Sequence, residues 1–270
     1  MSQINLLLYI TFSNGDTLSC IPLVEKIKMK YPDVNLVFCC FASHKYLIEH
    51  LNIPVVVMDC DYTYFKHFPD FTQNRILEIC PKDFIPINLW CGTYNFGHSW
   101  SNQIKVFNMQ CKEKNLDLFL DEEDFGYINL PNLDVDVREN AVYIENGINL
   151  SNQSDFNFDI YKLSIMFPRV NFYLTSSSPY KSKNIFTSEN KNLIYLANVS
   201  KKCKMIIGKG SGPFFCTLNY DNKDKIKALF GLKEQWTKDN FKFWEPKNDK
   251  ILLRYTEQEL YELLRMIPKI

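Results

Sequence analysis

The sequence predicts an α/β fold in two parts, each built around a parallel sheet. In the first half of the chain, apolar runs alternate with segments of helical periodicity. This alternation stops in an acidic stretch and starts again in the second half. The 270 residues are enough for one large domain or for two of roughly 130 residues each. We therefore expect an N-terminal domain over residues 1–130 and a C-terminal domain over residues 140–270.

The first half opens as a β-α-β-α-β succession, which predicts right-handed crossovers between parallel strands. Gly15-Asp16 reads as a short loop, and Pro22 is compatible with the following helix if that helix begins near Ser19. The expected strands are 5–12, 34–41, 54–58 and 85–90, and the expected helices are 17–30, 44–51 and 101–114, with helices or loops at 62–68 and 73–80.

The stretch 121–140 is the best candidate linker, because it is rich in aspartate and glutamate and contains Pro131. After it, the second half reads as another α/β unit. The expected strands there are 141–145, 170–174, 193–195 and 204–207, and the expected helices are 160–167, 196–202, 213–220 and 256–266.

A glycine-rich segment, IIGKGSGPFF, carries the strongest chemical signal. Gly208, Gly210 and Gly212 follow a buried apolar run and precede Pro213, which is compatible with the first position of a helix. A strand, a tight loop and a helix N-terminus together present backbone N–H groups to an anion such as phosphate. A plain strand-to-helix corner, in which the glycines serve close packing, explains the same pattern.

Composition and motifs exclude several classes of protein. Lys+Arg and Asp+Glu both total 31, so the basic excess typical of duplex-binding proteins is missing and no nucleic-acid partner is expected. No apolar run reaches the roughly 20 residues of a spanning helix. The nine cysteines are scattered, which favours a reducing, cytoplasmic location. The four histidines do not cluster, and GxGxxG, P-loop, GxSxG and HExxH strings do not occur, so we expect no metal and no resident cofactor.

Two α/β units joined by a linker place a cleft between the carboxyl ends of two parallel sheets, where ligands of such folds bind. Asp16 follows the first strand and stands near a helix start. It is therefore either a helix N-cap or a general base that projects into the cleft.

Two segments of the chain resemble the heptosyltransferase-like glycosyltransferases. Gly15-Asp16, Pro22 and the stretch 28–34 (KMKYPDV) are similar to the opening of that family, and 193–218 is similar to its C-terminal signature. The resemblance implies a GT-B fold, with two Rossmann-like domains facing each other across a cleft. It also implies inverting, metal-independent transfer, with the acceptor on the first domain and the donor nucleotide on the second.

The same resemblance assigns roles to individual residues. Asp16 matches the general base, and Ser211, Gly212 and Pro213 match the loop that holds the donor's diphosphate. The family commonly has aspartate where this chain has Gly210, and Lys209 is either a partner of a phosphate or a solvated side chain.

Weaker candidates complete the predicted site. Asn146 and Gly147 match a loop that faces the donor, and Ser176 either contacts the nucleotide or belongs to a polar turn. Glu145 reads as a strand-end cap or surface group, although it is close enough in sequence to reach the donor. Gly15 and His98 are the acceptor candidates, in a region where Trp90 and its aromatic neighbours either stack on a sugar or pack in the core.

The resulting hypothesis is a glycosyltransferase of glycan biosynthesis. It moves a sugar from a nucleotide-diphosphate-sugar to a hydroxyl of a glycan or glycolipid. No transmembrane segment is expected, and peripheral contact with a membrane is compatible with the sequence. The alternative is a catalytically silent protein of the same fold that binds a nucleotide, a sugar or a partner protein. A nucleotide-sugar epimerase would need further acid and base residues, and the sequence identifies none.

Overall fold

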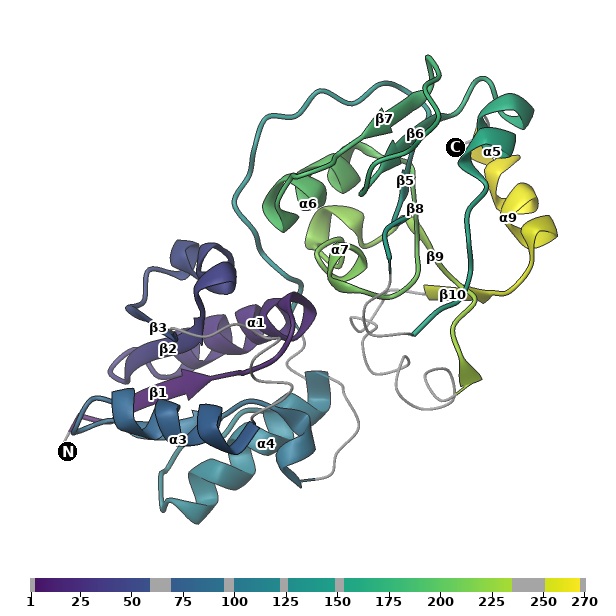
Figure 1. Cartoon of the computed structure of the whole chain (residues 1–270). Coiled ribbons are helices and arrows are strands. Elements are labelled where there is room, and N and C mark those ends of the chain that lie inside the picture. Colours follow the sequence, from purple (N-terminus) through teal and green to yellow (C-terminus); the bar gives the residue numbers. More distant parts are fainter. Residues whose placement is uncertain are drawn as a thin grey trace. The chain divides into compact units, whose positions relative to one another are not determined.

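The computed structural model describes residues 3–58, 69–94, 100–121, 126–148, 153–234 and 251–267. The chain forms two compact units, Met1–Asn129 and Leu130–Ile270, each with its own parallel sheet (Figure 1). Among the described residues, no helix is both long enough and apolar enough to cross a bilayer.

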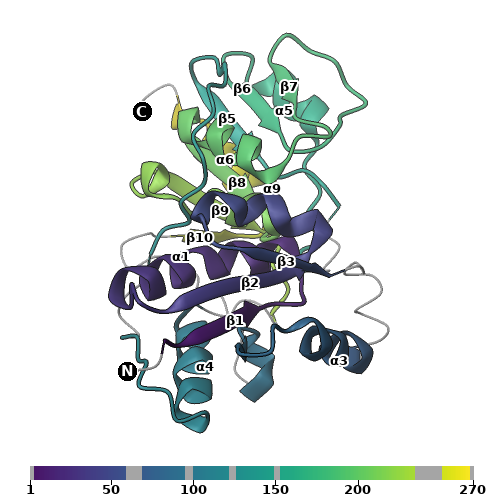
Figure 2. The same cartoon turned by 90° about the vertical axis from the view of Figure 1, so that its left-hand side faces the viewer.

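The first unit contains a four-stranded sheet in the order β3-β2-β1-β4, and its strands all run parallel. Helices α1 and α3 lie on opposite faces of this sheet (Figure 2). Its elements are β1 (Asn5–Tyr9), α1 (Asn14–Lys30), β2 (Asn35–Phe41), the 3-10 turns η1 (Ala42–Leu47) and η2 (Glu49–Leu51), β3 (Val55–Met58), α3 (Pro69–Ile79), β4 (Ile85–Asn88), η3 (Cys91–Tyr94) and α4 (Trp100–Glu113).

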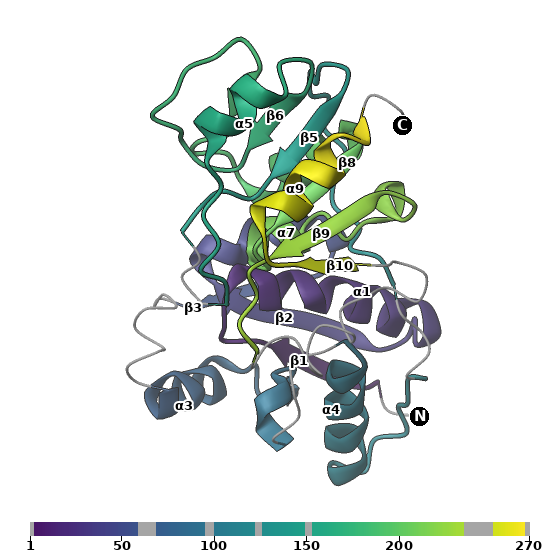
Figure 3. The same cartoon turned by 90° about the vertical axis from the view of Figure 1, so that its right-hand side faces the viewer.

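The second unit contains a six-stranded parallel sheet in the order β10-β9-β8-β5-β6-β7. Figure 3 shows α9 across one face of this sheet. Its elements are β5 (Ala141–Ile144), α5 (Ile160–Met166), β6 (Asn171–Leu174), β7 (Ile185–Thr187), α6 (Leu193–Lys202), β8 (Met205–Gly208), α7 (Gly212–Phe215), η4 (Tyr220–Asn222), β9 (Ile226–Phe230), β10 (Ile251–Arg254) and α9 (Glu257–Leu264).

The main core of the second unit lies between the sheet and the helices α5 and α9. Alternate residues of the four central strands supply one side of it, because successive side chains of a strand point to opposite faces. These strand residues, all buried, are Val142, Ile144, Phe172, Leu174, Met205, Ile207, Ala228 and Phe230. Leu260, Leu263 and Leu264 from α9 supply the other side at helical spacing.

The start of α1 differs from the prediction. The helix begins at Asn14, so Gly15 and Asp16 belong to its first turn rather than to a loop, and Pro22 lies in its interior. The reason is local, because the Asp16 carboxylate accepts hydrogen bonds from the N–H (3.1 Å) and the hydroxyl (2.7 Å) of Ser13. This arrangement closes the helix N-terminus three residues earlier than the apolar periodicity suggests.

Two predictions in the second unit are wrong. Residues 193–195 form no strand; they open α6, because the Asn192 side chain accepts a hydrogen bond from the N–H of Tyr195 at 2.9 Å. The extent of the helix expected at 213–220 is also wrong: a helix opens at this point with Pro213 in its first turn, but α7 spans only Gly212–Phe215. After it the backbone turns tightly, with N–H groups of Thr217 and Leu218 donating to carbonyls three residues earlier. The helix or loop expected at 62–68 lies outside the described residues.

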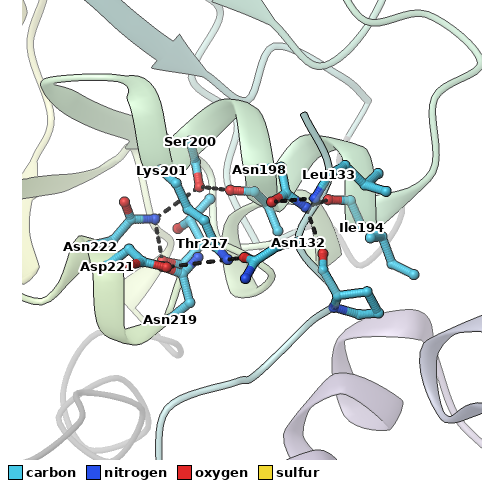
Figure 4. Close-up of polar contacts among 12 residues, drawn as sticks. Asn132, Leu133, Ile194, Asn198, Ser200, Lys201, Thr217, Asn219, Asp221 and Asn222 are labelled. Carbon is cyan, nitrogen blue, oxygen red and sulfur yellow. Dashed lines mark hydrogen bonds and ion pairs between the residues drawn. The ribbon is translucent and has the colours of Figure 1, made fainter. Parts of the chain in front are cut away.

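The chain segment before β5 is fastened to α6 by the buried side chain of Asn198 (Figure 4). Its amide nitrogen donates to the carbonyls of Pro131 (2.9 Å) and Ile194 (2.8 Å). Its amide oxygen accepts from the N–H of Leu133 at 3.1 Å. Lys201 adds a hydrogen bond to Asn132 at 2.6 Å, so this segment is part of the second unit.

Replacing Asn198 with alanine is therefore expected to lower the free energy of unfolding by about 1–3 kcal/mol, because it removes three hydrogen bonds of a buried side chain and leaves part-buried backbone groups without this partner. Asp134→Asn is the control, since it only weakens an ion pair with Lys202 on an exposed side chain, which is worth less than about 1 kcal/mol. Urea denaturation measures both, and equal effects of the two variants would contradict the assignment.

Candidate functional site

The strand order of the second sheet reverses between β5 and β8. The chain runs outward from β5 through β6 to β7, and then returns to place β8 on the other side of β5. In open α/β sheets, ligands bind outside the carboxyl ends of the strands at such a point. Glu145–Gly147 follow β5 and Lys209–Ser211 follow β8, so both candidate donor segments stand at this reversal.

The loop after β8 already holds an anion, and that anion belongs to the chain itself. The carboxylate of Glu145 accepts hydrogen bonds from the backbone N–H groups of Lys209 (2.6 Å), Gly210 (3.0 Å) and Ser211 (3.1 Å). The hydroxyl of Ser211 donates to the same carboxylate. The loop thus has the expected anion-binding geometry, but Glu145 uses its N–H groups.

Burial shapes the charges at this loop. Glu145 is 2% exposed and Lys209 is 8% exposed. Burial raises the pKa of Glu145, although its hydrogen bonds from Ser211 and Lys209 act in the opposite direction. Burial also lowers the pKa of Lys209, which the charge of Glu145 partly offsets. The two residues therefore form an opposite-charge pair in which each supports the ionised form of the other.

Gly208 leaves the room that the Glu145 carboxylate occupies. A Cβ atom at this position would lie 2.8 Å from Oε2 of Glu145 and 2.5 Å from the ring of Phe214. Gly210 meets a different need, because its φ of 84° lies in the left-handed region that favours glycine.

The Gly208→Ala variant is expected to lose about 1–3 kcal/mol of stability, because both neighbours are buried and have to shift. Gly147→Ala is the matched comparison. Its Cβ would meet only the small hydroxyl of Ser176, at 2.7 Å, which moves by rotation. Urea midpoints of the two variants test this ordering, and a larger loss for Gly147→Ala would contradict it.

The other donor candidates meet at the neighbouring strand end. The Asn146 side chain accepts from the N–H of Ser176 at 2.9 Å and donates to the carbonyl of Ser177 at 3.2 Å. Gly147 lies against Ser176. Asn146, Gly147 and Ser176 therefore form one cluster directly after Glu145, at the ends of the adjacent strands β5 and β6.

Gly212 and Pro213 open α7, which has only four residues. A helix of one turn contributes little dipole, so the backbone N–H groups carry the anion-binding capacity of this corner. The hydroxyl of Tyr143, on β5, donates to the carbonyl of Pro213 at 2.6 Å and so links α7 to β5.

In the first unit, Asp16 stands outside the carboxyl end of β1, where the strand order reverses between β1 and β4. Gly15 precedes it in the first turn of α1. Phe12 and Trp90, which follow these two strands, stack with ring centroids 4.6 Å apart. In the same unit, Nδ1 of buried His44 lies 3.0 Å from the Thr17 hydroxyl, and burial lowers the pKa of His44 to about 4.

The donor candidates thus lie after the carboxyl ends of strands in the six-stranded sheet. Asp16 and Gly15 lie after the carboxyl end of β1 in the four-stranded sheet. His98, the second acceptor candidate, lies outside the described residues. Sequence reasoning underrated Glu145, and the only available signal was a carboxylate directly after a buried strand. Within the described ranges, no group of three or more histidine, cysteine, aspartate or glutamate side chains is placed to hold a metal ion.

Comparison of the sequence with models of protein families and with curated proteins gives no match. Solved structures, in contrast, match over the whole chain. A glycosyl transferase family 9 protein from Veillonella parvula has a TM-score of 0.60 at 12% identity, covering 100% of this chain and 91% of that one. The E. coli heptosyltransferase WaaC with ADP has a TM-score of 0.60 at 11% identity, covering 98% of this chain and 100% of its own.

The glycosyltransferase VinC in complex with dTDP is also similar, with a TM-score of 0.52 at 11% identity, covering 98% of this chain and 91% of VinC. Likenesses at this level of identity establish the fold. The chain has the GT-B fold of these glycosyltransferases, which confirms the predicted fold class and, at the level of fold, the resemblance to the heptosyltransferase-like proteins.

Proposed function

We propose that the chain is a glycosyltransferase that moves a sugar from a nucleotide-diphosphate-sugar to a hydroxyl of a glycan or glycolipid. The observation that carries this proposal is the likeness across both units to WaaC, a heptosyltransferase solved with ADP. In this proposal, residues 1–130 of the chain form the domain that binds the acceptor, and residues 140–270 form the domain that binds the donor. The scattered cysteines favour a cytoplasmic protein.

In the proposed reaction, the acceptor hydroxyl attacks the anomeric carbon while the bond from that carbon to the donor's phosphate oxygen breaks. The configuration at the anomeric carbon inverts. Asp16 takes the hydroxyl proton, and the nucleoside diphosphate leaves with the bonding electrons. A carboxylate accepts up to about four hydrogen bonds, so the hold of Ser13 on Asp16 is compatible with this role.

The leaving diphosphate is assigned to the loop of Lys209, Gly210, Ser211, Gly212 and Pro213. Backbone N–H groups and the ammonium of Lys209 supply its stabilisation without a metal. Asn146, Gly147 and Ser176 flank the donor. Gly15 and His98 belong to the acceptor side of the proposal.

A thermal-shift screen of nucleoside diphosphates and nucleotide-sugars tests the donor assignment. A ligand at 100 times its Kd adds about 2.7 kcal/mol to the stability of the folded state, which raises the melting temperature measurably. We expect a shift with one nucleotide base, and a much smaller shift in the Lys209→Ala variant. Absence of any shift would contradict the donor assignment.

Two observations favour the silent alternative. Glu145 fills the loop that would hold the diphosphate, and Gly210 stands where the similar family commonly has aspartate. A catalytically silent binding protein would bind a nucleotide or a sugar in the thermal-shift screen but consume no donor.

A further inference from the structure

The carboxylate of Glu145 sits where the proposed function needs the donor's phosphate. We propose that Glu145 is a built-in anion that keeps phosphate out of the Lys209–Ser211 loop, and that a diphosphate group binds there only when this carboxylate leaves. The inference rests on the proposed function, because it takes this loop as the diphosphate site. It makes Glu145 a residue that sets the affinity and the specificity of the loop for anions.

The Glu145 carboxylate takes up several hydrogen-bond donors of the loop. Three consecutive N–H groups, at 2.6, 3.0 and 3.1 Å, and the Ser211 hydroxyl all serve the two oxygens of Glu145. A backbone N–H forms one strong, well-aligned hydrogen bond at a time. Phosphate oxygens therefore gain these donors only if the carboxylate gives them up.

The negative charge of Glu145 also opposes the binding of a phosphate. The carboxylate is almost completely buried, and Lys209 is the cation whose charge acts on it. Among the described residues, Glu145 also acts on the Tyr143 hydroxyl and the Cys216 thiol, and burial raises the pKa of both, so they stay neutral. A phosphate beside this carboxylate would place two negative charges together where solvent screening is weak. The two anions therefore exclude each other.

The backbone around the Glu145 carboxylate is shaped to hold it. Gly208 gives Glu145 its place, since any side chain there would meet Oε2 at 2.8 Å. The carboxylate reaches the loop from the end of β5, which pairs in parallel with β8, so the two segments follow neighbouring strand ends. The position of the Glu145 carboxylate is thus fixed by the ends of β5 and β8. It differs in this from a chance contact of an exposed glutamate.

Pyrophosphate binding to Glu145→Gln, measured by titration calorimetry, tests the inference. Glutamine is nearly isosteric, but it is neutral and its NH2 group cannot accept a bond from the loop. We expect Glu145→Gln to bind pyrophosphate about tenfold or more tightly than the wild type. Glu139→Gln removes the same charge from an exposed position of the same unit and should leave the affinity unchanged. Equal or weaker binding by a folded Glu145→Gln protein overturns the inference.

If Glu145→Gln does not fold, hydrogen exchange in the wild type gives the answer. Pyrophosphate should change the exchange rates of the Lys209, Gly210 and Ser211 amides, because these groups change their acceptor. Bound pyrophosphate with unchanged exchange at all three amides overturns the inference. A wild-type chain that transfers sugar although Glu145→Gln gains no affinity refutes this inference alone. Gained affinity without transfer by either form refutes the proposed function alone.

Discussion

Replacing Asp16 with asparagine is expected to lower the rate of sugar transfer by about 10²–10⁴, which is the usual contribution of a general base. Asparagine cannot take the proton of the acceptor hydroxyl, so the loss should fall on kcat. Donor affinity should remain within a few-fold of the wild type, because the donor candidates all belong to the other unit. Transfer kinetics together with a nucleotide-binding assay measure both quantities.

Asp16 also closes the N-terminus of α1, so a control has to separate capping from catalysis. Ser13→Ala removes the hydroxyl that donates to Asp16 at 2.7 Å but keeps the carboxylate. Losing such a cap costs about 1 kcal/mol. We expect Ser13→Ala to lose stability and retain transfer within a few-fold. A fully active Asp16→Asn enzyme, or a Ser13→Ala variant as inactive as Asp16→Asn, would contradict the catalytic role.

Truncating Phe230 to alanine is expected to give the largest loss of stability, about 3–5 kcal/mol. Phe230 is completely buried on β9. Its ring packs against Phe156 and Phe158, with centroids 5.0 and 5.8 Å away. Alanine would leave a cavity in the core of the second unit that the rigid sheet cannot close. Urea denaturation followed by circular dichroism measures the change in the free energy of unfolding.

Phe230→Leu is the matched control, because it retains most of the buried volume and should cost clearly less than the alanine variant. The backbone carbonyl of Phe230 accepts a bond from the Ser154 hydroxyl at 2.6 Å, and both variants keep it. A difference between them therefore reports on side-chain packing. Equal losses in the two variants would show that the ring does not act through the volume it fills.

The strands were the most predictable part of the fold. Four apolar runs form strands close to the expected bounds. These strands end at Phe41, Met58, Leu174 and Gly208. Buried parallel strands read as continuous apolar runs, so the signal is strong. Three strands were missed. The edge strands β7 and β10 have only three or four residues, which carry too little periodicity. The internal strand β9 has five residues, but Lys227 interrupts its apolar run.

The errors at helix starts have one physical cause. Side-chain caps decided where α1 and α6 begin, through Asp16 on Ser13 and Asn192 on Tyr195. Apolar periodicity reports the buried face of a helix but not its caps, so the predicted starts fell too late along the chain.

The candidate site shows a similar limit. The glycine pattern indicated an anion-binding loop, and the loop does bind an anion. That the anion is Glu145 depends on β5 and β8 being neighbours in the sheet, although 64 residues separate Glu145 from Lys209. Sequence spacing alone does not reveal such a long-range contact.

The central claim, sugar transfer from a nucleotide donor, has a direct test. The purified chain is incubated with a panel of nucleotide-diphosphate-sugars and glycan acceptors, and the released nucleoside diphosphate and the product are quantified. We expect that at least one donor is consumed, that the new glycosidic bond has inverted configuration, and that Asp16→Asn suppresses the reaction. A chain that binds a nucleotide-sugar but neither consumes it nor forms a product would contradict the claim.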